Sequence, residues 1–271
     1  MQDKYRILAL DIDGTLAHGD RSISEYTQQT LIQAQKQGIR IVIASGRPAF
    51  GISPVADQLR LADYGGYVLA YNGGEIWNWQ TKSRIYEKPL PADSIPLIYD
   101  ACRRAGVDVM TYCDSEIITE AKDNPYILLS SKRNRMQLTV VPSFLQGIRY
   151  PIFKCMIVGE PERLQEFEPR LNAELEGRAV AFRSEPFYLE VVPTGIDKAT
   201  CLEVILSHLD LDRSSLIACG DGYNDISMIR FAGLGVAMEN ANDQVKQSAD
   251  YITLSNEADG VAHVVNKFLL S

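Results

Sequence analysis

A short apolar run that stops at two carboxylates dominates the start of the chain. Residues 7–10 read Ile-Leu-Ala-Leu, and Asp11-Ile12-Asp13-Gly14-Thr15 follows directly. A short run of apolar residues predicts a strand buried on both faces, which is typical of a parallel sheet. Ligands of open parallel sheets bind outside the carboxyl ends of the strands. The pattern therefore predicts an α/β fold in which Asp11 and Asp13 project into a crevice and Gly14 lets the chain turn away.

Two acids one residue apart can share the work of phosphoryl transfer. Asp11 would attack phosphorus as the nucleophile, and Asp13 would protonate the leaving oxygen and later activate water. An isolated Asp-x-Asp is more often an exposed turn, a helix start or a simple divalent-metal site. The buried strand before the pair and Gly14-Thr15 after it favour catalysis, because a solvated turn needs no apolar run to lead into it.

Composition narrows the class of protein. The chain has 271 residues, of which 46% are apolar and 23% charged, so it can bury a large core as one big domain or two smaller ones. The formal charge of -8 argues against nucleic acid or an anionic membrane as the main partner. No targeting or membrane-spanning stretch is expected. The 5 cysteines are scattered without Cys-x-x-Cys spacing, which predicts reduced thiols in a cytoplasmic protein.

A second strand delivers polar residues to the same predicted edge. The β-branched run 39–44 follows a predicted helix over 24–37 and ends in Ser45-Gly46-Arg47-Pro48. A right-handed strand–helix–strand unit would set Ser45 beside Asp11, where a hydroxyl and backbone N–H groups suit a phosphate oxygen. Alternatively, Ser45 caps the following helix and Gly46 only eases the turn. A third apolar run, 67–70, also ends in turn residues.

The middle of the chain differs in character and predicts an α+β module over residues 86–188. Helices at 93–104 and 161–175 alternate with strands, which include a hairpin over 107–120, and no carboxylate cluster follows any of these strands. We expect one sheet with helices on one face. The basic cluster Lys132-Arg133-Asn134-Arg135 could reach an anionic substrate, but a solvated face is the simpler explanation.

After this module the chain returns to the earlier pattern. Lys198 opens a helix, where its charge opposes the helix dipole, so it needs an anion unless it reaches solvent. The strand at 216–219 ends in Gly220-Asp221-Gly222-Tyr223-Asn224-Asp225. Asp225 could simply complement the dipole of the next helix, whereas Asp221 between two glycines is better explained by a ligand.

Four separated motifs resemble those of the haloacid dehalogenase-like phosphohydrolases, and within them the Cof-type sugar phosphatases with a class IIB cap. They are Asp11-Ile12-Asp13-Gly14-Thr15, Ser45-Gly46-Arg47, Lys198 and Gly220-Asp221-Gly222-Tyr223-Asn224-Asp225, in the family's order. The likeness continues to Asn240-Ala241 and covers the whole chain. Ala199 replaces the subgroup's usual glycine, which puts only local backbone freedom in doubt.

The resemblance implies a doubly wound, Rossmann-like parallel-sheet core over residues 1–85 and 189–271. Residues 86–188 would be an inserted α+β cap that selects the substrate. Mg2+ would be held by Asp11, the backbone carbonyl of Asp13, and Asp221, with Asp225 behind them. Phosphate oxygens would meet the backbone N–H groups of Ile12 and Gly46 and the side chains of Ser45, Lys198 and Asn224. Without a cation, the converging carboxylates would repel one another.

The leading hypothesis is a Mg2+-dependent phosphatase that hydrolyses a small phosphorylated metabolite, such as a sugar phosphate, through an aspartyl-phosphate. A phosphomutase would instead return the acyl phosphate to a sugar. A phospho-receiver switch also gathers acids, a hydroxyl and a lysine, but Asp13 supplies acid–base chemistry that a receiver would avoid. A metal-dependent sugar-nucleotide binder leaves Lys198 and Asp225 without a role. The identity of the substrate and the oligomeric state stay open.

Overall fold

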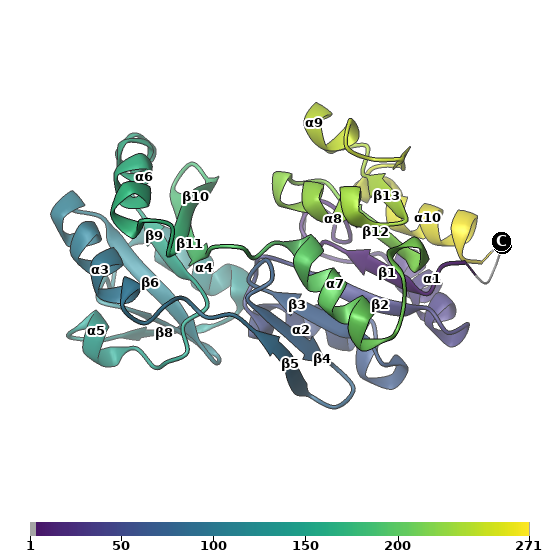
Figure 1. The fold of residues 1–271 in the computed structure, drawn as a ribbon, viewed down its shortest axis with the longest axis horizontal. Coiled ribbons are helices and arrows are strands. Elements are labelled where there is room, and N and C mark those ends of the chain that lie inside the picture. The colour runs from purple at the N-terminus through teal and green to yellow at the C-terminus, as the bar shows by residue number, and fades with distance from the viewer. Residues whose placement is uncertain (1–3, 271) are drawn as a thin grey trace. The chain divides into compact units, whose positions relative to one another are not determined.

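The computed structural model describes residues 4–270 and divides into two compact units. The first unit takes the described parts of Met1–Tyr86 and Asp197–Ser271, and the second is Glu87–Ile196 (Figure 1). The chain therefore leaves the first unit once, builds the second as an insertion, and returns.

An eight-stranded sheet forms the first unit, in the order β14-β13-β12-β1-β2-β3-β4-β5. The strands from β14 to β3 are parallel, and β4 is antiparallel to β3. Their bounds are β1 (Ile7–Leu10), β2 (Arg40–Ala44), β3 (Tyr67–Ala70), β4 (Glu75–Asn78), β5 (Ser83–Glu87), β12 (Leu216–Gly220), β13 (Leu234–Ala237) and β14 (Tyr251–Ile252). All residues of β1 are 0% exposed, which confirms the predicted buried strand.

Register places the ends of the three central strands together. Leu10, the last residue of β1, lies opposite Cys219 of β12 and Ile43 of β2. Because the three strands are parallel, the residues that follow each of them emerge at one edge of the sheet. The sequence predicted this arrangement from the polar residues that end each apolar run.

Helices cover the sheet of the first unit. They are α1 (Glu25–Lys36), α2 (Ala49–Gln58), α7 (Lys198–His208), α8 (Ile226–Phe231), α9 (Asp243–Lys246) and α10 (Gly260–Phe268), with short 3-10 turns at Leu61–Tyr64, Arg213–Ser215, Tyr223–Asp225 and Asn256–Ala258. Ile7 and Ala9 of β1 share a buried cluster with Ile205 of α7 and Met228 of α8. The helix predicted at 24–37 is confirmed as α1, where the Ser24 hydroxyl accepts a hydrogen bond from the N–H of Thr27.

The second unit contains a six-stranded sheet in the order β10-β11-β9-β6-β7-β8. Its strands are β6 (Asp108–Cys113), β7 (Glu116–Thr119), β8 (Gln137–Val140), β9 (Cys155–Val158), β10 (Ala179–Glu185) and β11 (Tyr188–Pro193), and its helices are α3 (Ser94–Ala105), α4 (Pro125–Asn134), α5 (Phe144–Gly147) and α6 (Pro161–Leu175). The predicted hairpin is present as β6 and β7, which pair antiparallel with Cys113 opposite Glu116.

Helices lie on both faces of this second sheet, not on one as expected. Residues of α3, α5 and α6 share a buried cluster with alternate sheet residues such as Val109 and Leu189. Side chains alternate between the faces of a strand, so Tyr112 and Tyr188 point the other way. There they meet α4, because the Tyr112 hydroxyl lies 3.1 Å from that of Ser130 and the Tyr188 hydroxyl donates to the Tyr126 carbonyl.

The return to the first unit comes later than the expected residue 189. Strand β11 pairs antiparallel with both β9 and β10, so its backbone hydrogen bonds belong to the second sheet. The chain re-enters the first unit at Asp197, just before α7. No helix among residues 4–270 is both long and apolar enough to cross a membrane. All 5 cysteines are free, in agreement with the predicted reduced thiols, and all are buried.

Candidate active site

A fully buried lysine lies at the centre of the strand-end residues. Lys198 is 0% exposed, and its Nζ donates hydrogen bonds to Oδ1 of Asp11 at 2.6 Å and to Oδ1 of Asp225 at 2.5 Å. The sequence predicted that a lysine in the first turn of a helix needs an anion, and the structure provides two. Burial lowers the pKa of Lys198, but the two carboxylates raise it by more than burial lowers it. The pKa therefore lies above its ordinary value.

Three carboxylates form a cluster that fits a divalent cation. Oxygen atoms of Asp11, Asp221 and Asp225 all lie within 4.8 Å of one another. Asp225 Oδ2 accepts hydrogen bonds from the backbone N–H groups of Asp221 at 3.0 Å and Gly222 at 2.8 Å. Since Asp225 Oδ1 accepts from Lys198, both oxygens of Asp225 already accept hydrogen bonds within the protein, and Asp11 and Asp221 are the better candidates for direct ligands. Carboxylate oxygens are the ligands that Mg2+ prefers.

Burial perturbs two of these acids. It raises the pKa of Asp11 from 3.8 to about 8, against the opposing charge of Lys198. It also raises the pKa of Asp221 from 3.8 to about 6, although the hydroxyl of Thr15 donates a hydrogen bond that lowers it. Neighbouring carboxylates add to both increases. The cluster therefore favours the uptake of positive charge, as a proton or as a metal ion.

Asp13 does not share this cluster through its side chain. Its carboxylate forms a two-point ion pair with Arg47, whose Nε lies 2.8 Å from Oδ2 and whose terminal nitrogen lies 2.5 Å from Oδ1. Arg47 belongs to the predicted Ser45-Gly46-Arg47 motif, but the motif alone predicted no role for it. The backbone carbonyl of Asp13 stays a predicted metal ligand.

Apart from Lys198, which opens α7, the residues predicted to bind phosphate follow β1, β2 and β12. Ser45 is 2% exposed, and its hydroxyl accepts a hydrogen bond from the N–H of Arg47 at 3.2 Å. Helix α2 begins after Pro48 without a side-chain cap, so Ser45 is not the cap of that helix. Ile12 is buried directly after β1, between the two acids. Its role and those of the other predicted phosphate ligands remain proposals.

Asn72 is hydrogen-bonded to one of these predicted ligands, lies close to another, and was missed from the sequence. Its side-chain oxygen accepts a hydrogen bond from Asn224 Nδ2 at 3.0 Å. A Cβ added to Gly46 would lie 3.0 Å from the side-chain nitrogen of Asn72. Asn72 has a φ of 56°, a conformation that asparagine tolerates better than most residues. The turn residues after β3 were its only sequence signal.

Gly14 is required by the geometry of the site. Its φ is +85°, and a Cβ there would lie 2.3 Å from Oδ2 of Asp221. The next residue, Thr15, donates the hydrogen bond that holds Asp221 Oδ1 at 2.7 Å. The turn after β1 therefore fixes the position of a carboxylate that follows β12.

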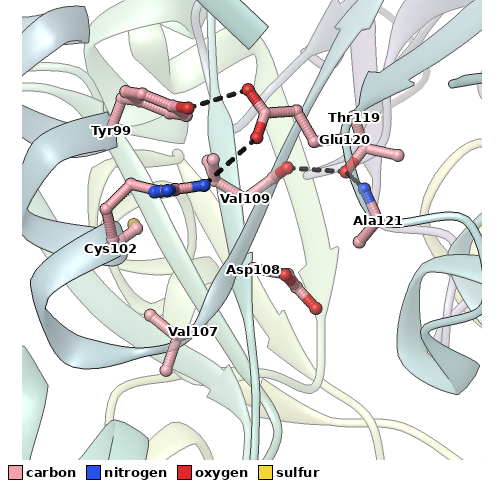
Figure 2. Close-up of a pocket in the computed structure, with 9 residues that line it drawn as sticks. Tyr99, Cys102, Val107, Asp108, Val109, Thr119, Glu120 and Ala121 are labelled. Carbon is pink, nitrogen blue, oxygen red and sulfur yellow. Dashed lines mark hydrogen bonds and ion pairs between the residues drawn. The ribbon is translucent and has the colours of Figure 1, made fainter. Parts of the chain in front are cut away.

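A pocket in the second unit is lined by residues of α3, β6, β7 and the segments next to them, and none of the predicted site residues is among them (Figure 2). Glu120 at its wall accepts a hydrogen bond from the Tyr99 hydroxyl at 2.8 Å and pairs with Arg103 at 3.7 Å. The N–H of Phe144 also donates to Glu120, at 2.6 Å. Glu120 and Arg103 are thus paired with each other, Asp108 accepts a hydrogen bond from Asn124 at 2.8 Å, and these lining residues form no catalytic constellation.

Comparison with known proteins agrees with the geometry. The family model described as haloacid dehalogenase-like hydrolase matches residues 8–265. The crystal structure of a haloacid dehalogenase-like hydrolase from Bacteroides thetaiotaomicron has a TM-score of 0.95 and 47% sequence identity, and the match covers 97% of this chain and 99% of that one.

Two curated relatives are similar over nearly their full length. A 5-amino-6-(5-phospho-D-ribitylamino)uracil phosphatase of Bacillus subtilis is 30% identical, with 98% of this chain and 96% of the relative covered. An HMP-PP phosphatase of Yersinia pseudotuberculosis is 28% identical, with 98% and 96% covered. The family match extends through both parts of the core sheet and the insertion between them. The chain therefore belongs to the haloacid dehalogenase-like hydrolases, within the Cof-type subgroup.

Proposed function

We propose that this chain is a Mg2+-dependent phosphatase that hydrolyses small phosphorylated metabolites, with sugar phosphates as the expected class, through an aspartyl-phosphate on Asp11. The observation that carries the proposal is the buried contact of Lys198 with Asp11 and Asp225 at the carboxyl edge of the sheet. A fully buried cation beside a carboxylate at this edge is suited to a dianionic phosphoryl group. The similarity to the two curated relatives described above, which are phosphatases, also supports it.

In the first step, an oxygen of Asp11 attacks phosphorus. The bond between phosphorus and the leaving oxygen breaks, and a proton from Asp13 passes to that oxygen, so the alcohol departs neutral. Lys198 holds Oδ1 of Asp11 at 2.6 Å and so fixes the direction in which the carboxylate faces. Ser45, Asn224 and the backbone N–H groups of Ile12 and Gly46 would receive the phosphoryl oxygens.

In the second step, Asp13 accepts a proton from water as the water oxygen bonds to phosphorus. The bond between phosphorus and Asp11 breaks, which releases inorganic phosphate and restores the Asp11 carboxylate and the proton on Asp13. The predicted Mg2+ ligands are Asp11, the Asp13 carbonyl and Asp221, with Asp225 orienting the loop. When bound, Mg2+ supplies positive charge that offsets the acids and polarises the phosphoryl group.

A rapid-quench experiment tests the proposed intermediate. Unmodified protein mixed with a labelled phosphate monoester and Mg2+ should carry an acid-stable, base-labile phosphoryl label on Asp11. Asp11→Asn is the matched control, since it keeps the side-chain shape and removes the nucleophile, and it should carry none. A label on another residue, or hydrolysis in a single turnover without any label, would overturn the proposal.

The expected substrate class is tested separately. A panel of phosphate monoesters with Mg2+ should rank sugar and polyol phosphates above aryl phosphates of similar size. The inserted unit is the proposed source of this preference, because the core residues described above address only the phosphoryl group. A transfer of phosphate to a second sugar in the same assay would instead favour a phosphomutase.

A further inference from the structure

The ion pair between Arg47 and Asp13 fixes the side chain of the proposed acid–base residue. The guanidinium reaches both carboxylate oxygens, at 2.8 and 2.5 Å. Two parallel N–H···O bonds set the orientation of a carboxylate as well as its position, which one ammonium group cannot do. Asp13 follows β1 and Arg47 follows β2, so the pair spans two neighbouring strand ends.

The two partners differ in exposure. The side chain of Arg47 is 16% exposed and that of Asp13 is 51% exposed. The backbone of Arg47 is held on both sides, because its N–H donates to the Ser45 hydroxyl at 3.2 Å and its carbonyl accepts from the N–H of Tyr71 at 3.0 Å. Arg47 is therefore the fixed partner, and Asp13 is the partner whose side chain would otherwise sample several rotamers.

A purely structural role does not explain this asymmetry. Ion pairs in which one partner is half exposed contribute little to folding stability, because solvent screens the charges. The strand ends are already joined by the ladder of β1 and β2. In contrast, a proton-transfer group displaced by about 1 Å can lose on the order of a hundredfold in rate, so its orientation matters far more to catalysis than to folding.

We propose that Arg47 is a positioning residue that acts through Asp13. It orients the Asp13 carboxylate beside the end of β1. One of its two hydrogen bonds to that carboxylate breaks when Asp13 exchanges a proton with the leaving oxygen or with water. This inference rests on the proposed function, since it assumes that Asp13 performs acid–base catalysis. Arg47 itself is not assigned any contact with the reacting atoms.

The two half-reactions separate this role from direct substrate binding. With p-nitrophenyl phosphate the leaving group needs little protonation, whereas hydrolysis of the aspartyl-phosphate still needs Asp13 to activate water. In Arg47→Ala, the dephosphorylation rate should fall about ten- to a hundredfold, and the rate of the p-nitrophenol burst should change by less than about threefold. Arg47→Lys keeps the charge but not the two-point contact, so it should recover only a small part of the loss.

A double-mutant cycle and a matched control complete the test. In an Asp13→Ala background, Arg47→Ala should change dephosphorylation by less than about twofold, because the residue through which it acts is absent. Arg60→Ala is the control, since Arg60 also forms an ion pair, with Nε at 2.7 Å and a terminal nitrogen at 2.6 Å from Oδ2 of Asp63, and neither residue belongs to the proposed site. It should leave both rates unchanged. Melting temperatures of all variants would identify any loss of folding.

The possible failures can be told apart. Equal losses in both half-reactions, or the same loss with and without the Asp13 carboxylate, would show that Arg47 binds the phosphoryl group directly and would overturn the inference alone. A burst without any phosphoenzyme in the unmodified protein would overturn the proposed function, and this inference with it.

Discussion

The ammonium nitrogen of Lys198 lies 2.6 Å from Oδ1 of Asp11, although 187 positions separate the two residues along the chain. Asp11 follows β1, and Lys198 is the first residue of α7, directly after the inserted unit. The contact therefore joins the two segments of the core that the insertion separates. Since Lys198 also donates to Asp225, a single buried cation organises carboxylates from two strand ends.

Replacing this cation should destabilise the protein in a pH-dependent way. Lys198→Met keeps a long side chain but leaves two buried acids unpaired, and breaking a buried pair costs about 3–5 kcal/mol. Lys198 lowers the pKa of Asp11, so its loss raises that pKa further above the ordinary value of 3.8. A group with a raised folded-state pKa stabilises when protonated at low pH and loses that effect as pH rises. The loss should therefore be larger at pH 8 than at pH 5.

Urea unfolding of metal-free protein at the two pH values measures this difference. Lys36→Met is the matched control, because Lys36 is exposed in the last turn of α1. Its unfolding free energy should change little at either pH. An equal and small loss in both variants would show that the Lys198 contacts do not stabilise the fold.

Gly14→Ala should disable the site although it replaces no charged residue. An added methyl would lie 2.3 Å from Oδ2 of Asp221, at a φ of +85° that is itself strained for alanine. We expect activity and the stabilisation by Mg2+ to fall together. Gly38→Ala is a close control, since Gly38 has a φ of +93° and no atom within 4 Å of the added Cβ. It should lose about 1–2 kcal/mol from backbone strain but keep its activity.

Much of the core could be predicted because short buried strands and the polar residues after them leave clear patterns. Helix α4 was missed, although Asn124 caps it and Pro125 opens it, because its only buried residues are Ile127 and Ser130 and its apolar periodicity is weak. The return boundary was placed before β11 because strand pairing, which assigns β11 to the second sheet, is not encoded locally.

The site was predictable where the topology alone brings residues together. Register places the segments after β1, β2 and β12 at one edge of the sheet. The positions of Asp11, Ser45 and Asp221 directly after predicted strands were therefore enough to predict that they lie together. Side-chain direction is not fixed by topology. Asp13 turns to Arg47, and Asn72 reaches Asn224, through rotamers that depend on packing across the whole edge.

Asp13→Asn should slow phosphate esters of poor leaving groups most. A general acid–base residue contributes a factor of about 10^2 to 10^4 to the rate. Because p-nitrophenolate is a good leaving group, it departs with little protonation by Asp13. The rate at which a sugar phosphate phosphorylates Asp11 should therefore fall by that factor, and the rate of the p-nitrophenol burst with p-nitrophenyl phosphate should fall much less. Equal losses for both esters in the phosphorylation of Asp11 would show that Asp13 does not protonate the leaving group.

Mg2+ should raise the melting temperature more at pH 8 than at pH 5. In metal-free protein, the pKa values of Asp11 and Asp221 are raised from 3.8 to about 8 and about 6. Their protons stabilise the folded state at low pH, and this stabilisation is lost as pH rises through those values. Protons also compete with the metal at pH 5. Thermal melts with EDTA or Mg2+ at each pH measure the shift, and a larger shift at pH 5 would contradict the prediction.

Replacing Asp221 with Asn should separate stability from metal binding. The substitution removes one negative charge from a cluster within 4.8 Å of two other carboxylates, so the metal-free protein should melt at the same or a higher temperature. It also removes a proposed ligand. In unmodified protein, Mg2+ that binds only the folded state adds about 2.7 kcal/mol at a hundredfold excess over its Kd. Asp221→Asn should lose most of that gain together with activity. A variant that kept the full Mg2+ shift in a thermal melt would show that Asp221 is not a metal ligand.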